Sequence, residues 1–309
     1  MNRRSLLGSA KAMVAGLSLM GISSAKASDT KITPASRTRG QMNFVEAKDG
    51  TQLFYRSWGT GRPIVFISAW ALHSEAWQYQ MTPICDEGFR CVAFDRRSHG
   101  RSSDPGTGYD LDTLADDLAT VLTRLNLTDV TLVGHSLGAA ESVRYLTRHG
   151  TARISRLVLI APTTPCLTKS ADNLDGLDPR IFEGMRAAFR DDFPGIIAAN
   201  IKPFFVPTTS QAMTDWVVQM MAQCSLKALI DCNRSFASAD FRQDLPMLSI
   251  PTLILQGTAD ASAPLELTGK KTAALLPKAT LKVYDGAPHG LIFTHTRQVN
   301  EDLLKFARS

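Results

Sequence analysis

One serine in the chain stands in a setting that favours nucleophilic chemistry. It is Ser136, within the run Gly134-His135-Ser136-Leu137-Gly138, which has the pattern G-x-S-x-G between an apolar segment and a helix-forming one. A serine on a sharp turn between a strand and a helix exposes its hydroxyl, and the flanking glycines let the backbone cross closely. A hydroxyl is a weak nucleophile until a base takes its proton, so the pattern requires partners elsewhere in the chain.

Two partners follow later segments of strand character. Asp260 lies just beyond the apolar segment 252–256, and His289 lies just beyond the segment 281–284. In an open parallel sheet, the loops after the strands converge on one edge, where ligands bind. We expect His289 to accept the Ser136 proton and Asp260 to fix the tautomer of His289 and stabilise its imidazolium form. The order Ser, Asp, His along the chain is that of the α/β-hydrolase triad.

The same reaction needs hydrogen-bond donors for the negative charge that develops on a substrate oxygen. We expect the backbone N–H groups of Leu137 and Trp70 to supply them, since Leu137 opens a helix and Trp70 follows the apolar segment 64–68. One such donor contributes roughly 2.7–4 kcal/mol to stabilisation of the transition state. An alternative acid after Ala161 is less suitable, because no carboxylate occurs there before Asp172.

The remaining histidines are expected to have supporting roles. We expect His99 and His135 to line or support the site without reacting, and His73, His149 and His295 to be surface or structural groups. The chain has no H-E-x-x-H motif and no carboxylate cluster, so no metal is expected. The charged pairs Arg96-Arg97 and Asp116-Asp117 are expected to anchor a loop and to lie on a helix surface, respectively.

The segments that must position these residues alternate between strands and helices. A hairpin is predicted from residues 44–47 and 53–58 around the turn Asp49-Gly50. The later predicted strands are 64–68, 91–95, 130–134, 157–161, 252–256 and 281–284, and the predicted helices lie near 75–84, 111–125, 137–149, 265–276 and 296–307. Short apolar runs between amphipathic helices indicate an α/β fold whose parallel sheet is covered on both faces.

This alternation stops at about residues 163–248, a proline-interrupted segment of helical character. We interpret it as a helical lid inserted between two core strands of a single domain, residues 42–309. Five apolar residues of this segment either line an acyl pocket beneath the lid or form the packing core of the lid itself, namely Phe204, Phe205, Trp216, Met220 and Met221.

The N-terminus has the order of a bacterial export signal. Residues 1–27 contain Arg3-Arg4, an apolar run at 12–22 and the small-x-small sequence Ala25-Lys26-Ala27. The paired arginines and the weakly hydrophobic run favour the twin-arginine machinery as a partner, with cleavage after Ala27 and a flexible leader at 28–41. We therefore expect a periplasmic or secreted protein that is exported folded. An uncleaved amphipathic anchor and an ordinary secretory signal are the alternatives.

Composition excludes several classes of protein. The 309 residues include 34 basic and 29 acidic residues, and four of the basic residues lie within 1–27, so the remainder is nearly neutral and nucleic-acid binding is not expected. No apolar run approaches the ~18 residues of a membrane span. The five cysteines have no zinc spacing, and buried reduced thiols are favoured over a Cys85–Cys91 or a Cys224–Cys232 bridge.

Four stretches together resemble one family. They are the run Asp95-Arg96-Arg97-Ser98-His99-Gly100-Arg101-Ser102, the turn at Ser136, the segment 235–241, and Gly286-Ala287-Pro288-His289-Gly290-Leu291. From about Phe44 to Ala307 the chain resembles the cofactor-free (non-haem) chloroperoxidase and aryl esterase branch of the α/β-hydrolase superfamily. The resemblance implies an eight-stranded, mostly parallel sheet, this triad, no cofactor, and hydrolysis of a small ester or lactone. In some members hydrogen peroxide attacks the acyl-enzyme.

The chain departs from this branch in the loop before Trp70. Ser68-Ala69 replaces the usual His-Gly, Ala71 stands where peroxide-using members typically have proline, and Ser98 replaces a glycine. Three hypotheses follow: a serine hydrolase that forms an acyl-enzyme, a perhydrolase that uses hydrogen peroxide, and a catalytically silent ligand-binding protein. The sequence defines neither the substrate nor the oligomeric state.

Overall fold

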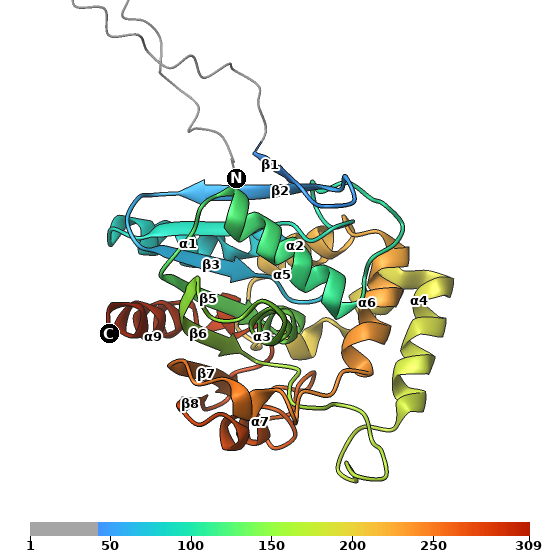
Figure 1. Ribbon diagram of the computed structural model, residues 1–309. Helices are drawn as coiled ribbons and strands as arrows, with labels where there is room; N and C mark the ends of the chain where they lie inside the picture. Colours follow the sequence, from blue (N-terminus) through green and yellow to red (C-terminus); the bar gives the residue numbers. More distant parts are fainter. Residues whose placement is uncertain (1–42) are drawn as a thin grey trace, which may run out of the picture. The chain divides into compact units, whose positions relative to one another are not determined.

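A central eight-stranded sheet organises the protein, for which a computed structural model describes residues 43–309 (Figure 1). The predicted signal and leader therefore lie outside the described residues. The strand order is β1-β2-β4-β3-β5-β6-β7-β8. Pairing is antiparallel for β1–β2 and β2–β4 and parallel for every other neighbouring pair, so the predicted mostly parallel sheet is confirmed. The strands are β1 (Phe44–Glu46), β2 (Gln52–Trp58), β3 (Pro63–Ile67), β4 (Arg90–Phe94), β5 (Val130–His135), β6 (Ile154–Ile160), β7 (Thr252–Gly257) and β8 (Ala279–Tyr284).

Helices cover both faces of this sheet. The α-helices are α1 (Gln78–Asp86), α2 (Leu111–Arg124), α3 (Leu137–His149), α4 (Pro179–Asn200), α5 (Gln211–Met221), α6 (Leu226–Ala237), α7 (Gly269–Leu275), α8 (Leu291–Thr294) and α9 (Thr296–Arg308). Side chains alternate along β3, so that Ile64 and Phe66 pack with α1, α8 and α9 while Val65 and Ile67 pack with α2 and α3. Two apolar layers explain why the central strands are apolar without alternation.

The predicted helix at 265–276 begins later than expected. Helix α7 starts at Gly269, because residues 264–268 form a turn in which the N–H groups of Leu267 and Thr268 both bond the Pro264 carbonyl. The Thr268 hydroxyl also bonds the carbonyl oxygens of Ala263 and Pro264. This turn continues the loop that carries Asp260. Helix α7 therefore begins only after the turn, at Gly269.

Between β6 and β7 the chain leaves the sheet and forms what we call the helical insert, residues 161–251 (yellow to orange in Figure 1). It includes the segment predicted as a lid and carries α4, α5 and α6. Helix α4 is interrupted at Asp192, with φ −156° and ψ 77°, two residues before Pro194. Proline lacks an N–H and restricts its neighbours, so it breaks the helix there. The insert packs on the core through Phe189, Val217 and other apolar residues.

Two observations concern the described residues as a whole. No helix within 43–309 is both long and apolar enough to cross a membrane. All five cysteines in this range are free, with four of them buried and Cys85 partly exposed.

The expectation that Asp116-Asp117 lies on a helix surface is wrong for Asp117. Asp117 faces inward from α2 and is 3% exposed. Its carboxylate accepts two hydrogen bonds from Arg97, from Nε at 2.7 Å and from Nη2 at 2.8 Å. Arg97 also bonds Asp49 at 2.8 Å, so it anchors its loop as predicted. Burial raises the pKa of Asp117, and the Arg97 guanidinium opposes that rise.

This buried pair generates a stability prediction. Substitution Arg97→Met leaves the Asp117 carboxylate buried without its partner, which we expect to lower the free energy of unfolding by about 3–5 kcal/mol. Urea denaturation followed by circular dichroism measures the change. The double substitution Arg97→Met with Asp117→Leu removes the uncompensated charge and should restore most of the loss. Equal destabilisation in the single and double variants would contradict this account.

Candidate active site

Ser136 occupies a strained turn between β5 and α3. Its φ of 57° and ψ of −115° lie in a region that non-glycine residues rarely adopt. A Cβ atom on Gly134 would lie 2.3 Å from the Gly138 carbonyl oxygen, and one on Gly138 would lie 2.3 Å from the Ile67 carbonyl oxygen. Both glycines of the sequence pattern are therefore required by close backbone approach, which holds the serine at the edge of the sheet.

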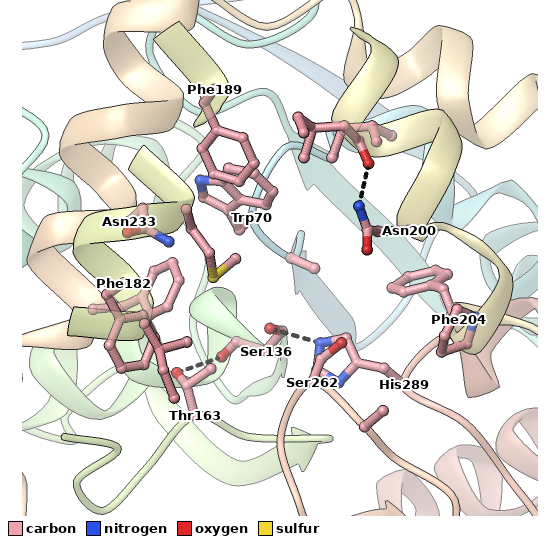
Figure 2. A pocket seen from close by; sticks show the side chains of 18 of the residues that line it. Trp70, Ser136, Thr163, Phe182, Phe189, Asn200, Phe204, Asn233, Ser262 and His289 are labelled. Carbon is pink, nitrogen blue, oxygen red and sulfur yellow. Dashed lines mark hydrogen bonds between the residues drawn. The ribbon is translucent and has the colours of Figure 1, made fainter. Parts of the chain in front are cut away.

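The loops beyond β7 and β8 bring Asp260 and His289 to this turn. His289 Nε2 lies 2.9 Å from Ser136 Oγ, and His289 Nδ1 lies 2.8 Å from Asp260 Oδ2 (Figure 2 shows the Ser136–His289 contact). Each of the three residues is 5% exposed. The structure thus joins the three residues singled out in the sequence by two hydrogen bonds. The serine hydroxyl can donate to His289 only while Nδ1 carries the imidazole proton toward Asp260.

The Asp260 carboxylate accepts hydrogen bonds from three donors in β7 and the loop that follows it. Its Oδ1 accepts hydrogen bonds from the backbone N–H groups of Ser262 and Ala263, at 2.9 and 2.7 Å. Its Oδ2 accepts a further bond from Gln256 Nε2 at 2.9 Å. Gln256 was not among the site residues predicted from the sequence. The available signal was a long polar side chain near the end of a buried, mainly apolar strand, four positions before the acid.

The neighbouring histidines support the site without joining the triad. His135 is fully buried, and burial next to His289 lowers its pKa to about 3. It is therefore neutral, and its Nε2–H donates to the His289 carbonyl oxygen at 3.0 Å. His99 contacts the Arg97 carbonyl, so it stabilises the loop after β4. His73, which we expected to be surface or structural, is buried near Asp95.

The loop after β3 and the start of α3 carry the candidate donors for a developing negative charge, the N–H groups of Trp70 and Leu137. Among the described residues, neither the Trp70 nor the Leu137 backbone N–H donates to a protein acceptor. Trp70 lines the same cavity as Ser136. Its indole Nε1 donates to the Leu229 carbonyl of α6 at 2.8 Å, and its ring stacks on Phe189 of α4 with ring centroids 5.2 Å apart. The loop is therefore tied to the helical insert.

The buried side chain of Arg96 holds the loop after β3 in place. Its guanidinium donates to the carbonyl oxygens of Ser68 at 2.7 Å and Ala69 at 3.4 Å, and its Nε donates to Glu141 of α3. Burial raises the pKa of Glu141, and Arg96 opposes that rise. The Ser68 hydroxyl accepts a hydrogen bond from Trp77 Nε1 at 3.1 Å. The carbonyl groups of Ser68 and Ala69, which replace His-Gly, are thus both hydrogen-bonded to Arg96.

A cavity of about 600 Å³ opens in front of Ser136 and His289. Its walls are largely apolar and come mainly from α4 and the segment that follows it. Of the five residues considered for an acyl pocket, Phe204 and Met221 line this cavity. Phe205, Trp216 and Met220 instead pack in the core beneath the insert. Two of these five residues therefore line the pocket, and the other three belong to the packing core, so each of the two predicted roles applies to some of them.

The chemistry available here is nucleophilic attack by Ser136 assisted by His289. Within residues 43–309, no group of three or more histidine, cysteine or acidic side chains is arranged to hold a metal ion. The hydroxyl contacts the base, the base contacts its orienting acid, and the backbone N–H groups of Leu137 and Trp70 are free to donate, which is the set of groups that acyl transfer requires.

Comparisons with known proteins agree with this geometry. Residues 62–296 match a family model described as alpha/beta hydrolase fold. The non-heme chloroperoxidase CPO-A1 of Kitasatospora aureofaciens is 39% identical over 275 residues, which are 86% of this chain and 99% of that protein. The bifunctional esterase/perhydrolase DCH of Acinetobacter calcoaceticus is 36% identical over 87% of this chain and all of that protein. A bromoperoxidase structure from Bacillus anthracis has a TM-score of 0.84 at 35% identity, covering 87% of this chain and 100% of that one.

The paired Ser136 and His289 generate a prediction about reactivity. A fluorophosphonate probe should label the protein at Ser136, because His289 activates that hydroxyl toward an electrophilic phosphorus. Intact mass spectrometry measures one adduct per chain, and peptide mapping locates it. Ser136→Ala should abolish labelling, whereas Ser142→Ala, which changes another serine of α3, should retain it. Labelling that survives Ser136→Ala would mean that a different residue is the nucleophile.

Proposed function

Since the chain belongs to the alpha/beta hydrolase fold family, we propose that it is a serine hydrolase acting on a small carboxylic ester or lactone through an acyl-enzyme. The observation that carries the proposal is the chain of two hydrogen bonds from Ser136 through His289 to Asp260. The curated relative named as an esterase/perhydrolase supports ester hydrolysis as the reaction.

The proposed reaction has two halves. His289 takes the Ser136 proton as Oγ attacks the ester carbonyl, and the Trp70 and Leu137 N–H groups hold the resulting oxyanion. His289 then gives that proton to the departing alcohol, which leaves the acyl group on Ser136. In the second half a water molecule loses a proton to His289 and attacks the acyl-enzyme. Ser136 regains a proton as the carboxylic acid departs.

Water, rather than hydrogen peroxide, is the proposed acyl acceptor. Ala71 has a φ of 62°, whereas a proline ring fixes φ near −65°, so the loop holds a conformation that proline cannot adopt. In the branch that the chain resembles, peroxide-using members typically have proline at this position. Perhydrolysis is the second candidate, because relatives named as a chloroperoxidase and a perhydrolase are similar over most of the chain.

The cavity supports a substrate of moderate size. Its volume of about 600 Å³ lies within the range of roughly 300–1,000 Å³ that is usual for small-molecule sites. Side chains such as Phe182, Phe189 and Ile197 line it, so we propose an acyl group that is mainly hydrocarbon. The anchored loop at Ser68 and Trp70 argues against the catalytically silent alternative, since it is held in place and the Trp70 N–H bonds no acceptor among the described residues.

We also propose that the protein is exported from the cytoplasm. The paired arginines, the apolar run and the small-x-small site of residues 1–27 support removal of this segment after transport by the twin-arginine machinery. We propose that the mature enzyme acts in the periplasm or outside the cell on a small-molecule ester, without a cofactor and without nucleic acid.

Hydrolysis of p-nitrophenyl acetate tests the proposed activity. The mature protein should release nitrophenolate, and Ser136→Ala or His289→Gln should lower kcat by at least about 10³-fold, because triad members act together. Asp260→Asn should be less severe. Addition of a strong chelator should leave the rate unchanged. Turnover that persists in Ser136→Ala, or no turnover in the unsubstituted protein, would contradict the proposal.

Peroxide competition separates the two acyl acceptors. With p-nitrophenyl acetate, hydrogen peroxide and bromide present, we expect nitrophenolate release with little bromination of a halide-sensitive dye, because peracetic acid, which oxidises bromide, is not formed in quantity. A fluorescence or absorbance readout of dye bromination measures peracid formation. Bromination at a rate comparable to ester hydrolysis would make perhydrolysis the principal function.

The export proposal has its own measurement. Expression of the full chain in a bacterium with the twin-arginine pathway should yield periplasmic protein whose N-terminus, by mass spectrometry, is Ser28. Substitution of Arg3 and Arg4 together by lysine should retain the precursor inside the cell, because that pathway depends on the paired arginines. Periplasmic protein with an intact Met1, or unchanged export of the lysine variant, would contradict it.

A further inference from the structure

A buried amide in the cavity wall lacks a partner for its donor group. Asn233 of α6 is 1% exposed and lines the cavity. Among the described residues, its Nδ2 has no hydrogen-bond partner. A buried donor left unsatisfied is unfavourable, so this nitrogen favours an acceptor that the described residues do not supply.

Arg186 of α4 fixes which end of this amide is unpartnered. Its Nη1 donates to Asn233 Oδ1 at 3.0 Å. A guanidinium has donors only, so the oxygen must face Arg186 and the NH₂ group must face the other way. Figure 2 shows the amide nitrogen of Asn233 turned toward the cavity and its oxygen turned away. The positive charge on Arg186 also polarises the amide, which strengthens Nδ2 as a donor.

The position of Asn233 relative to Ser136 indicates which part of a substrate it meets. Figure 2 shows His289, Phe204 and Ser262 on one side of Ser136 and Asn233 with Phe182 on the other. The departing alcohol must lie beside His289, because Nε2 delivers its proton. The acyl chain therefore extends to the opposite side, toward Asn233.

Helix α6 connects this side of the cavity to the loop after β3. The Leu229 carbonyl bonds the Trp70 indole, and Asn233 lies four residues, or about 6 Å along the helix axis, beyond Leu229. Ser136 and Asn233 line the same cavity, so an acyl chain attached at Ser136 extends within that space toward Asn233.

From these contacts we propose that Asn233 is a specificity-determining residue that donates to an uncharged oxygen, such as a keto or amide carbonyl, on the acyl chain of the substrate. The inference deepens the proposed ester hydrolysis and rests on it. Aromatic and aliphatic walls around Asn233, including Phe182 and Phe236, disfavour a carboxylate at this point. Nδ2 itself is covered, so a ligand reaches it when flexible neighbours such as Met185 or Met221, which line the same cavity, move aside.

Matched ester pairs test this assignment. The p-nitrophenyl esters of 4-oxopentanoic and 6-oxoheptanoic acids differ from those of pentanoic and heptanoic acids only by a carbonyl in place of a methylene. We expect kcat/KM to favour the oxo ester by about tenfold in at least one pair, the effect of one hydrogen bond to a buried donor. In Asn233→Leu, which keeps a similar size without the donor, the ratio should fall to about one or below.

Ratios measured on one protein do not depend on how much of it is folded. Asn200→Leu provides the matched control, because Asn200 also lines the cavity but donates to the Ile196 carbonyl at 2.7 Å. That variant should keep the oxo preference. Equal rates for both members of every pair in the unsubstituted protein, or a preference that survives in Asn233→Leu, would overturn the inference.

Binding to Ser136→Ala separates failure of this inference from failure of the proposed function. This variant cannot form an acyl-enzyme, so calorimetry with the methyl esters of the same two acid pairs reports recognition alone. We expect the oxo ester to bind about tenfold more tightly in the pair that shows the kinetic preference. Equal affinities in both pairs would reject the role of Asn233 even if the enzyme hydrolyses esters. Tighter binding of the oxo ester would support it even if the reaction proves to be a different one.

Discussion

The strained turn at Ser136 is the constraint on which the rest of the site depends. A positive φ at a serine is unfavourable and persists only where the surrounding backbone leaves no alternative. Here β5, α3 and β3 approach so closely that no Cβ atom fits at Gly134 or Gly138. The same close approach places the N–H of Leu137 at the start of a helix, beside the loop that holds Trp70. One tight crossing thus determines both the position of the nucleophile and one of its proposed donors.

Buried arginines stabilise the loops around this turn. Arg96 bonds two carbonyls of the loop after β3 and pairs with Glu141, whereas Arg97 pairs with Asp117 and Asp49. Arg96 therefore stabilises the loop beside the cavity, whereas the adjacent Arg97 holds its own loop against α2. Buried ion pairs contribute little to net stability relative to apolar residues of similar size, because both charges lose their hydration. Here they fix loops that no strand or helix would otherwise hold.

Much of this arrangement could be predicted from the sequence. The strand segments were evident because apolar runs bounded by turns mark a covered parallel sheet, and the order Ser136, Asp260, His289 indicated which loops had to meet. What could not be predicted were the contacts between distant polar groups, such as Arg96 with Glu141 or Gln256 with Asp260. These depend on which helix face turns inward, and charged residues such as Asp117 give no periodic signal of burial. The division of Phe204, Phe205 and Trp216 between cavity and core also depends on the path of the insert after the break at Asp192.

The hydrogen bond from the Trp70 indole to the Leu229 carbonyl joins the insert to the loop beside the nucleophile. The part of the chain that shapes the cavity is thereby mechanically linked to the part that stabilises charge. Diversification of the insert toward new substrates is consequently constrained, because a shift of α6 that suits a new acyl group also moves a proposed oxyanion donor. In such a fold, substrate range and turnover evolve as coupled traits rather than as separate ones.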